Sequence, residues 1–174
     1  LAELYRSLPA RYPELKGKVA LVTGASRNIG AAIAARLARE GMRVVVHGLD
    51  AEETAATAAA LRDEGADTLA LAGDLSDTAL IDSLFDRALA AYGGIDVLVN
   101  NAADLRRVAS VKLNREMIDQ QLAVNVRAPL LCALRAAEVM RTAGDGSIIN
   151  VRSVGGLRAH LPGLPYGVTK GALD

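Results

Sequence analysis

The sequence predicts an α/β domain in which a doubly wound parallel sheet lies between two layers of helices. Short runs rich in Val, Ile and Leu alternate five times with longer amphipathic or Ala-rich stretches. Glycines follow several of these stretches, where a helix would end. Strands that alternate with helices in this way form a parallel sheet covered on both faces, since such crossovers are right-handed.

Three strand–helix units fill the first half of the chain. Strands are expected at residues 18–23, 43–47 and 68–72, and helices at residues 29–40, 51–64 and 77–92. Gly41, Gly65 and Gly93 follow the three helices and suit their C-terminal ends. Ser76 is the expected N-cap of the third helix, because a serine hydroxyl accepts from free backbone N–H groups.

The second half continues the alternation. Strands are expected at residues 95–99 and 147–151, a long helical region at residues 113–141, and a further helix from about Pro165. Asn114 is the expected cap of the long region, and Pro129 predicts a kink in it. Residues 1–15 are predicted to be an irregular arm before one domain at residues 16–174. Because the chain stops at Asp174 within a new helix, we expect the C-terminal part of this domain to be missing.

The composition argues against several classes of protein. Lys plus Arg and Asp plus Glu both number 20, so the formal net charge is zero, which disfavours a nucleic-acid binder. No apolar run approaches the length of a membrane span, so no membrane partner is expected. Cys132, the single cysteine, is predicted to pack in the core, and its solitude fits a reducing, cytoplasmic location. His47 and His160 lack partners at metal-ligand spacing, so no metal site is expected.

A glycine-bearing loop joins the first expected strand to the first helix. Residues 23–30 read Thr-Gly-Ala-Ser-Arg-Asn-Ile-Gly. Free backbone N–H groups and the positive end of the helix dipole meet there, which suits a pyrophosphate. Gly24 permits the sharp turn, and Gly30 lets the helix pack against the strand. The alternative is a strand-to-helix turn that merely requires glycine.

Tyr166 and Lys170 form the second motif. They lie four residues apart on the last expected helix and so share one face. A lysine ammonium near a phenol favours the phenolate, which suits a general acid/base for a carbonyl–alcohol pair. An exposed helix pair without chemistry is the alternative.

These motifs resemble those of the short-chain dehydrogenases/reductases. The loop is similar to their TGxxxGxG fingerprint, with Asn28 in place of the middle glycine; asparagine tolerates left-handed backbone better than most residues. The Asn-Asn-Ala run at residues 100–102, then Asn125, Ser153 and the YxxxK pair resemble further family motifs, in family order and spacing. The resemblance, from about Leu15 to the last residue, implies a Rossmann fold and an NAD(P)-dependent oxidoreductase. Such enzymes move a hydride between nicotinamide and a carbonyl or secondary alcohol.

The resemblance also implies catalytic roles. Tyr166 would be the general acid/base, and Lys170 would assist it. Ser153 would donate its hydroxyl to the substrate oxygen as charge develops there, and Asn125 would anchor a water that links the lysine to a proton relay. The alternatives are a polar loop residue for Ser153 and a mid-helix side chain that bonds backbone at the kink for Asn125.

A cofactor-binding set follows from the same resemblance. Its members are Gly24, Ser26, Arg27, Asn28, Ile29, Gly30, Asp74, Leu75, Asn101, Ala102, Tyr166 and Lys170. Asp74 would bind the adenine amino group, and Asn101 would hold the sheet edge. A capping or solvated acid for Asp74 and ordinary turn chemistry for Asn101 are the alternatives.

The choice of cofactor depends on the end of the second strand. An acidic residue there selects the ribose 2′-OH of NAD, and a basic group nearby favours the 2′-phosphate of NADP. Gly48 occupies the acidic position and Arg27 supplies a positive charge, so NADP(H) is expected over NAD(H). Leu49 lacks the basic group of many NADP-binding relatives, and Asp50 could still reach the ribose.

Two function classes therefore remain. The first is an enzyme acting on a small-molecule carbonyl or alcohol, with a full-length parent that is a homodimer or homotetramer. The second is a non-catalytic or inactive dinucleotide-binding fragment. The intact Ser–Tyr–Lys set favours the first, and a domain cut short within the catalytic helix favours the second.

Overall fold

The computed structural model describes residues 1–106, 112–158 and 163–173. Five parallel strands form one sheet in the order β3-β2-β1-β4-β5. They are β1 (Val19–Val22), β2 (Arg43–Gly48), β3 (Thr68–Ala72), β4 (Val97–Asn100) and β5 (Ser147–Asn150). The chain moves outward from β1 to β3, then returns to place β4 on the other side of β1. The prediction of a doubly wound parallel sheet is therefore confirmed.

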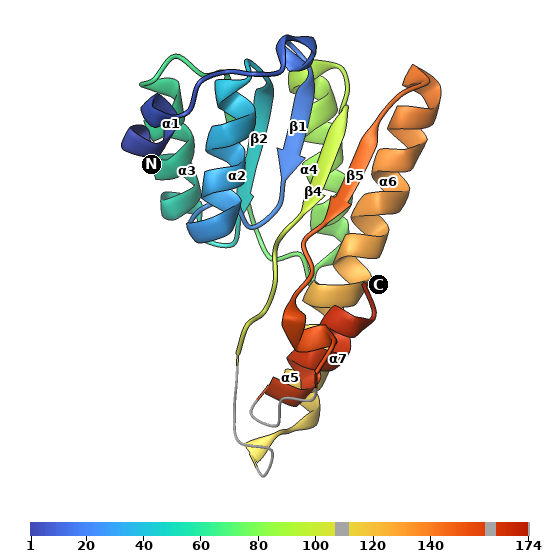
Figure 1. Ribbon diagram of the computed structural model, residues 1–174. Helices are drawn as coiled ribbons and strands as arrows, with labels where there is room; N and C mark the ends of the chain where they lie inside the picture. Colours follow the sequence, from blue (N-terminus) through green and yellow to red (C-terminus); the bar gives the residue numbers. More distant parts are fainter. Residues whose placement is uncertain (107–111, 159–162, 174) are drawn as a thin grey trace.

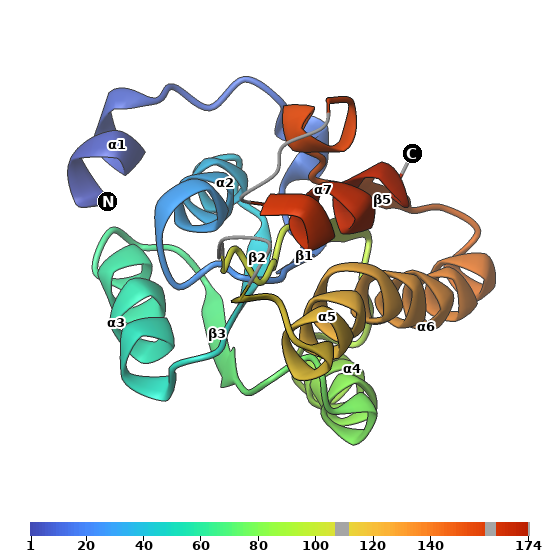
Figure 2. The same cartoon turned by 90° about the horizontal axis from the view of Figure 1, so that it is seen from below.

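Helices cover both faces of this sheet (Figures 1 and 2). The helices are α1 (Ala2–Ser7), α2 (Asn28–Arg39), α3 (Ala51–Arg62), α4 (Thr78–Tyr92), α5 (Arg115–Leu122), α6 (Ala128–Ala143) and α7 (Leu164–Gly171). Short 3-10 turns span Pro13–Leu15 and Val154–Gly156. Helices α1, α2 and α3 lie on one side, and α4 and α6 lie on the other. Below the carboxyl ends of the strands, α5 and α7 extend away from the sheet (Figure 1).

Alternate residues of each central strand enter two separate cores. Val44 and Val46 of β2 pack toward α2 and α3, and Val45 between them packs toward α4 and α6. Both cores are mainly aliphatic, with Phe85 in one and Tyr5 in the other, and the strand residues follow the period-two alternation of a strand. Cys132 lies in the second core, as predicted, and burial raises the pKa of its thiol to about 12. Every helix in the described ranges is too short or too polar to cross a membrane.

The helix ends agree with the sequence in most places. Gly93 adopts left-handed backbone at the end of α4, and the side chain of Asn114 caps α5 by accepting from the N–H of Met117. The prediction for Ser76 is wrong. Asp77 caps α4 instead, because its carboxylate accepts from the N–H of Ala79.

The long helical region is broken before Pro129 rather than at it. A π-helical turn at Ala123–Arg127 separates α5 from α6, and Pro129 stands in the first turn of α6. Proline has no N–H for the carbonyl four residues earlier, which is that of Asn125. The irregularity therefore falls on the turn that contains this carbonyl.

The N-terminal arm is ordered, which corrects the expectation of an irregular segment. Helix α1 buries Tyr5, whose ring lies 5.3 Å from the guanidinium carbon of Arg39. The same guanidinium donates to the carbonyl of Leu8 at 2.7 Å, and the Glu40 carboxylate accepts from the N–H of Arg11 at 2.8 Å. Side-chain contacts thus attach the arm to α2 and its C-terminal end. The arm shows no periodic pattern in the sequence that would predict these contacts.

Candidate active site

The loop between β1 and α2 has the backbone that its sequence suggests. Gly24 and Asn28 both have positive φ, at +63° and +52°, so asparagine does occupy a left-handed position. A Cβ on Gly24 would lie 2.7 Å from the Cα of Ala102, and one on Gly30 would overlap the carbonyl oxygen of Gly24. No side chain among the described residues caps the start of α2. Its first N–H groups therefore remain available to an anion.

Side chains at the end of β4 hold this loop in place. The amide Nδ2 of Asn101 donates to the carbonyls of Thr23 at 2.9 Å and Gly24 at 3.0 Å. In return, the Thr23 hydroxyl oxygen accepts from the backbone N–H groups of Asn101 and Ala102. Asn101 therefore joins two strands at the point where the strand order reverses. In open α/β sheets, that point is where ligands bind.

A cavity of about 1000 Å³ opens along the carboxyl ends of the strands. The predicted residues that line it are Gly24, Ser26, Arg27, Asn28, Ile29, Gly30, Asp74, Leu75, Asn101, Ala102, Ser153, Tyr166 and Lys170. Further lining residues that the sequence did not single out for the site include His47, Gly73, Val124, Val151 and Arg152. One continuous space thus connects the glycine loop with the Ser–Tyr–Lys set.

Three of the four catalytic candidates, Ser153, Tyr166 and Lys170, meet at one wall of this cavity. Lys170 is buried, and its ammonium Nζ donates to the carbonyl of Val151 at 2.8 Å. The same Nζ lies 6.0 Å from the centroid of the Tyr166 ring. Burial lowers the pKa of Lys170 from its ordinary value. The lysine ammonium therefore lies near the Tyr166 ring and is shielded from solvent.

Ser153 and Tyr166 flank the same glycine. A Cβ on Gly155 would lie 3.4 Å from the Ser153 Oγ and 3.5 Å from Cε1 of Tyr166. The N–H of Gly155 donates to the Ser153 Oγ at 3.1 Å. This bond uses an oxygen lone pair, so the hydroxyl hydrogen remains available to a ligand.

Asn125 does not line the cavity. It is fully buried in the π-helical turn, where its Oδ1 accepts from the N–H of Asp104 at 2.7 Å. Its Nδ2 donates to the Asp104 carbonyl and to the Thr169 hydroxyl, at 3.1 and 3.0 Å. The side chain therefore binds backbone, as the alternative expected, but backbone of a distant segment. It connects the chain after β4 to α7, beside Lys170.

The end of β2 holds charged residues in an arrangement that the sequence did not reveal. Arg27 forms an ion pair with Glu53, with Nη1 2.9 Å from Oε1. Asp50 caps α3 by accepting from the N–H of Glu53 at 2.8 Å, so its carboxylate is already engaged. A Cβ on Gly48 would lie 2.7 Å from the Cβ of Ser26. Position 48 therefore has no room for an acidic side chain.

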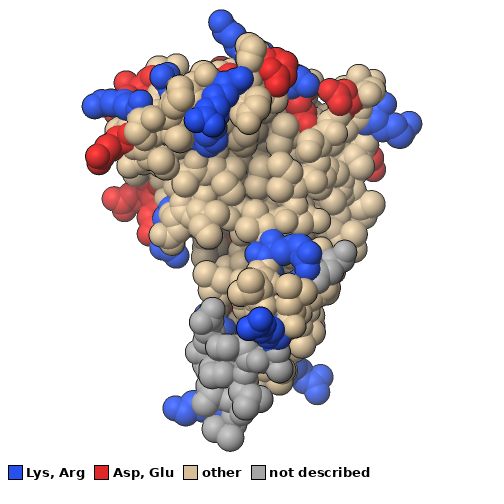
Figure 3. Space-filling view, viewed as in Figure 1, with Lys and Arg blue, Asp and Glu red and all other residues tan. Residues whose placement is uncertain are grey.

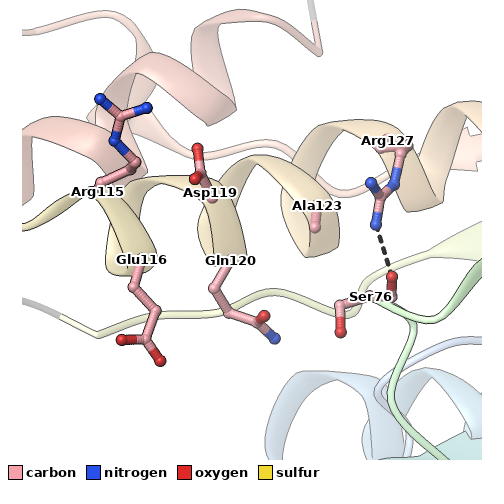
Figure 4. A pocket seen from close by; sticks show the side chains of 7 residues that line it. All are labelled: Ser76, Arg115, Glu116, Asp119, Gln120, Ala123 and Arg127. Carbon is pink, nitrogen blue, oxygen red and sulfur yellow. Dashed lines mark hydrogen bonds between the residues drawn. The ribbon is translucent and has the colours of Figure 1, made fainter.

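Asp74 lies in the cavity wall with both carboxylate oxygens bonded. One oxygen accepts from the N–H of Ser76 at 2.8 Å, and the other accepts from the Gln120 amide at 3.3 Å. A smaller pocket of about 580 Å³ adjoins this turn, with Gln120 and Glu116 on one side of α5 (Figure 4). There Arg127 donates to the Ser76 carbonyl at 2.6 Å (Figure 4). Asp74 thus accepts within its own turn, while Asp77 caps α4, and the contact of Asp74 with an adenine stays a prediction.

His47, near the end of β2, is buried and lines the same cavity. Its Nε2 lies 3.2 Å from the Gly73 carbonyl, and its Nδ1 has no hydrogen-bond partner among the described residues. Desolvation lowers the pKa of His47 to about 4, so the imidazole is neutral near pH 7. His160 lies outside the described residues. Within the described ranges, no cluster of three His, Cys, Asp or Glu side chains could hold a metal ion.

Known proteins share this sequence pattern. The family model described as short chain dehydrogenase matches residues 18–174. A sorbitol dehydrogenase of Cereibacter sphaeroides is 39% identical over 160 residues, which are 91% of this chain and 61% of that protein. An oxidoreductase of Thermotoga maritima is 36% identical over 159 residues, which are 91% of this chain and 62% of that protein. The chain thus spans less than two thirds of the length of these relatives.

Solved structures share the fold as well. A metagenomic short-chain oxidoreductase in complex with NADP matches with a TM-score of 0.86 and 38% identity, over 91% of this chain and 72% of that one. An NAD+-bound xylitol dehydrogenase matches with a TM-score of 0.86 and 28% identity, over 92% and 62% of the two chains. These two relatives hold different cofactors, so the likeness alone does not choose between them.

Proposed function

This chain belongs to the short-chain dehydrogenase family, and on that premise we propose that it supplies the cofactor site and catalytic wall of a carbonyl reductase or alcohol dehydrogenase. The observation that carries the proposal is the single cavity that joins the glycine loop to Ser153, Tyr166 and Lys170. Phosphate binding and acid/base chemistry in one space suit hydride transfer between a nicotinamide and a carbonyl or secondary alcohol.

The residues present fit a dinucleotide. Gly24 and Gly30 let the loop backbone pack closely against Ala102 and against itself, next to the start of α2, which has no side-chain cap among the described residues. A pyrophosphate there would accept from backbone N–H groups at the positive end of the helix. Asp74 and Leu75 also line the cavity and would contact the adenine. When bound, the nicotinamide supplies the hydride, and the chain's own residues do the rest.

The proposal gives Tyr166 the proton transfer. Its phenol would donate to the carbonyl oxygen during reduction and would accept from the alcohol during oxidation. The Lys170 ammonium lies 6.0 Å from the ring centroid, where its positive charge would face the negative charge that develops on the phenol oxygen during proton transfer. Ser153 would donate its free hydroxyl hydrogen to the same substrate oxygen, while the Gly155 N–H keeps its Oγ oriented.

We further propose that NADP(H) is bound in preference to NAD(H). The support is positive charge at Arg27 together with the absence of room for an acid at Gly48. Asp50, the alternative ribose ligand, already caps α3. The water relay through Asn125 stays a prediction, as does a cytoplasmic location.

We infer that catalysis requires more chain than these 174 residues. All four residues of β5 are exposed, including Ile148 and Ile149, and the face over β5 carries few charges (Figure 3). An exposed strand edge of this kind needs a partner or a cover. The relatives are longer than this chain, and additional chain of that kind could supply such a cover. A non-catalytic dinucleotide-binding fragment is therefore the second candidate for residues 1–174 alone, and a homodimer or homotetramer stays the proposal for the full-length protein.

The experiment uses the full-length protein, both cofactors and a panel of small carbonyl compounds and secondary alcohols. Binding of each cofactor is measured by calorimetry, and turnover is followed through the absorbance of the reduced nicotinamide. We expect binding of at least one cofactor and turnover of some panel members, with NADP(H) the tighter ligand. Tighter NAD(H) binding would refute the cofactor preference, and binding without turnover of any panel member would contradict the proposed catalysis.

A further inference from the structure

The first turn of α3 brings a carboxylate to two residues that line the cofactor cavity, Ser26 and Arg27. Both oxygens of Glu53 approach Nη1 of Arg27, at 2.9 and 3.1 Å. One of them also lies 3.5 Å from the hydroxyl of Ser26. The helix cap fixes the position of Glu53, because the N–H of this residue donates to Asp50.

The contacts around Gly48 place this carboxylate near the proposed ribose. In sheets of this type, the residue that ends the second strand lies against the ribose 2′ position. Gly48 ends β2, and a Cβ there would lie 3.0 Å from the Ser26 hydroxyl. Ser26 therefore lies close to both the strand end and Glu53, so the carboxylate would stand near a ribose bound at the strand end.

The charge balance at this position differs from the one that the sequence suggests. Arg27 alone would offer one positive charge, but its pairing with Glu53 brings the local sum to zero. A ribose 2′-phosphate carries roughly −1.5 to −2 charges near neutral pH, by analogy with other phosphate monoesters. It would have to draw Arg27 away from Glu53 and would be repelled by the carboxylate. A 2′-hydroxyl could instead donate a hydrogen bond to the same carboxylate.

We propose that Glu53 is a specificity-determining residue that restrains the preference of this chain for NADP(H). The inference rests on the proposed function, since it requires a dinucleotide in the cavity. Glu53 acts as the counter-ion of Arg27 and as a negative charge beside the 2′ position. The balance between these two side chains, rather than Arg27 alone, sets the discrimination between the cofactors.

The test compares Glu53→Gln with the unchanged full-length protein by calorimetric titration with NADPH and NADH. The Arg27 side chain is 70% exposed and that of Glu53 is 45% exposed, so we expect a modest effect. We expect the Kd for NADPH to fall about two- to fivefold, with no decrease in the Kd for NADH. The gain should shrink at high salt, because screening weakens exposed charge pairs.

Glu52→Gln is the matched control, because Glu52 is exposed on the same turn of α3. It removes the same charge from the helix. The ratio of its Kd for NADPH to its Kd for NADH should stay close to that of the unchanged protein. An unchanged ratio in Glu53→Gln at low salt would overturn the inference, as would an equal change in Glu52→Gln. Failure of the unchanged protein to bind either cofactor would instead overturn the proposed function.

Discussion

At the phosphate-loop end of the cavity all four residues of β1 are buried, whereas at the catalytic end all four residues of β5 are exposed. The loop is fixed by close backbone contacts at Gly24 and Gly30 and by the amide of Asn101. The catalytic wall depends on long-range bonds from short segments, such as that between Lys170 and Val151. The difference shows that close backbone packing holds the phosphate-loop end, while the other end rests on an exposed strand and a few long-range bonds.

The largest expected effect is a loss of turnover without a loss of cofactor affinity, which would distinguish the catalytic end of the cavity from the phosphate-loop end. Tyr166→Phe in the full-length protein should lower turnover about 10²–10⁴-fold, because the variant has no phenolic proton to transfer. The Kd of the cofactor should change little, since the loop is untouched. Steady-state kinetics and calorimetry measure the two quantities. Tyr12→Phe, at an exposed position, is the control; near-normal turnover in Tyr166→Phe would contradict the assignment.

Acid should act on the nucleotide end through His47. Its pKa is about 4 in the folded protein and about 6.5 in an unfolded chain, so the unfolded state binds more protons between these values. The free energy of unfolding should therefore fall as the pH falls from 6.5 to 4, by up to about 3 kcal/mol from this group. Urea unfolding at pH 7 and pH 4.5 measures the loss. An equally steep loss in His47→Gln would show that other groups cause it.

Overpacking the loop should give a smaller effect at the same end. In Gly30→Ala, the new methyl group would meet the Gly24 carbonyl and the Asn101 amide, so the loop must shift. We expect a loss of about 1–3 kcal/mol in the free energy of unfolding, with weaker binding of either cofactor. Gly94→Ala is the control, because a Cβ there has no described atom within 4 Å. Equal stability and affinity of the two variants would count against the rigid loop.

Much of the nucleotide end could be predicted from the sequence because its constraints are local. The glycine spacing and the tolerance of Asn28 for left-handed backbone are properties of neighbouring residues, and β3 has the bounds that its apolar run suggests. The resemblance predicts that Asn101 holds the sheet edge, and its two bonds to the loop fit that prediction.

The remainder depends on contacts between residues far apart in the chain. Nothing near Arg27 in the sequence indicates that Glu53 neutralises it, because the pairing arises only when β2 lies beside β1. Asn125 likewise finds its partners in Asp104 and Thr169, on two other segments. A sequence pattern shows which residue type stands at a position, but it does not show which distant group that residue contacts. The charge balance at the ribose end therefore required the structure.

The central claim is that one cavity binds the nicotinamide cofactor and passes its hydride to a carbonyl carbon. Isotope transfer tests it most directly: the full-length protein is incubated with NADPH, and separately with NADH, deuterated at nicotinamide C4, together with the carbonyl panel. Mass spectrometry then locates the label in the products. The account predicts deuterium on the carbinol carbon of at least one product, and loss of this transfer in Tyr166→Phe. Bound cofactor with no label in any product, or undiminished transfer by the variant, would contradict it.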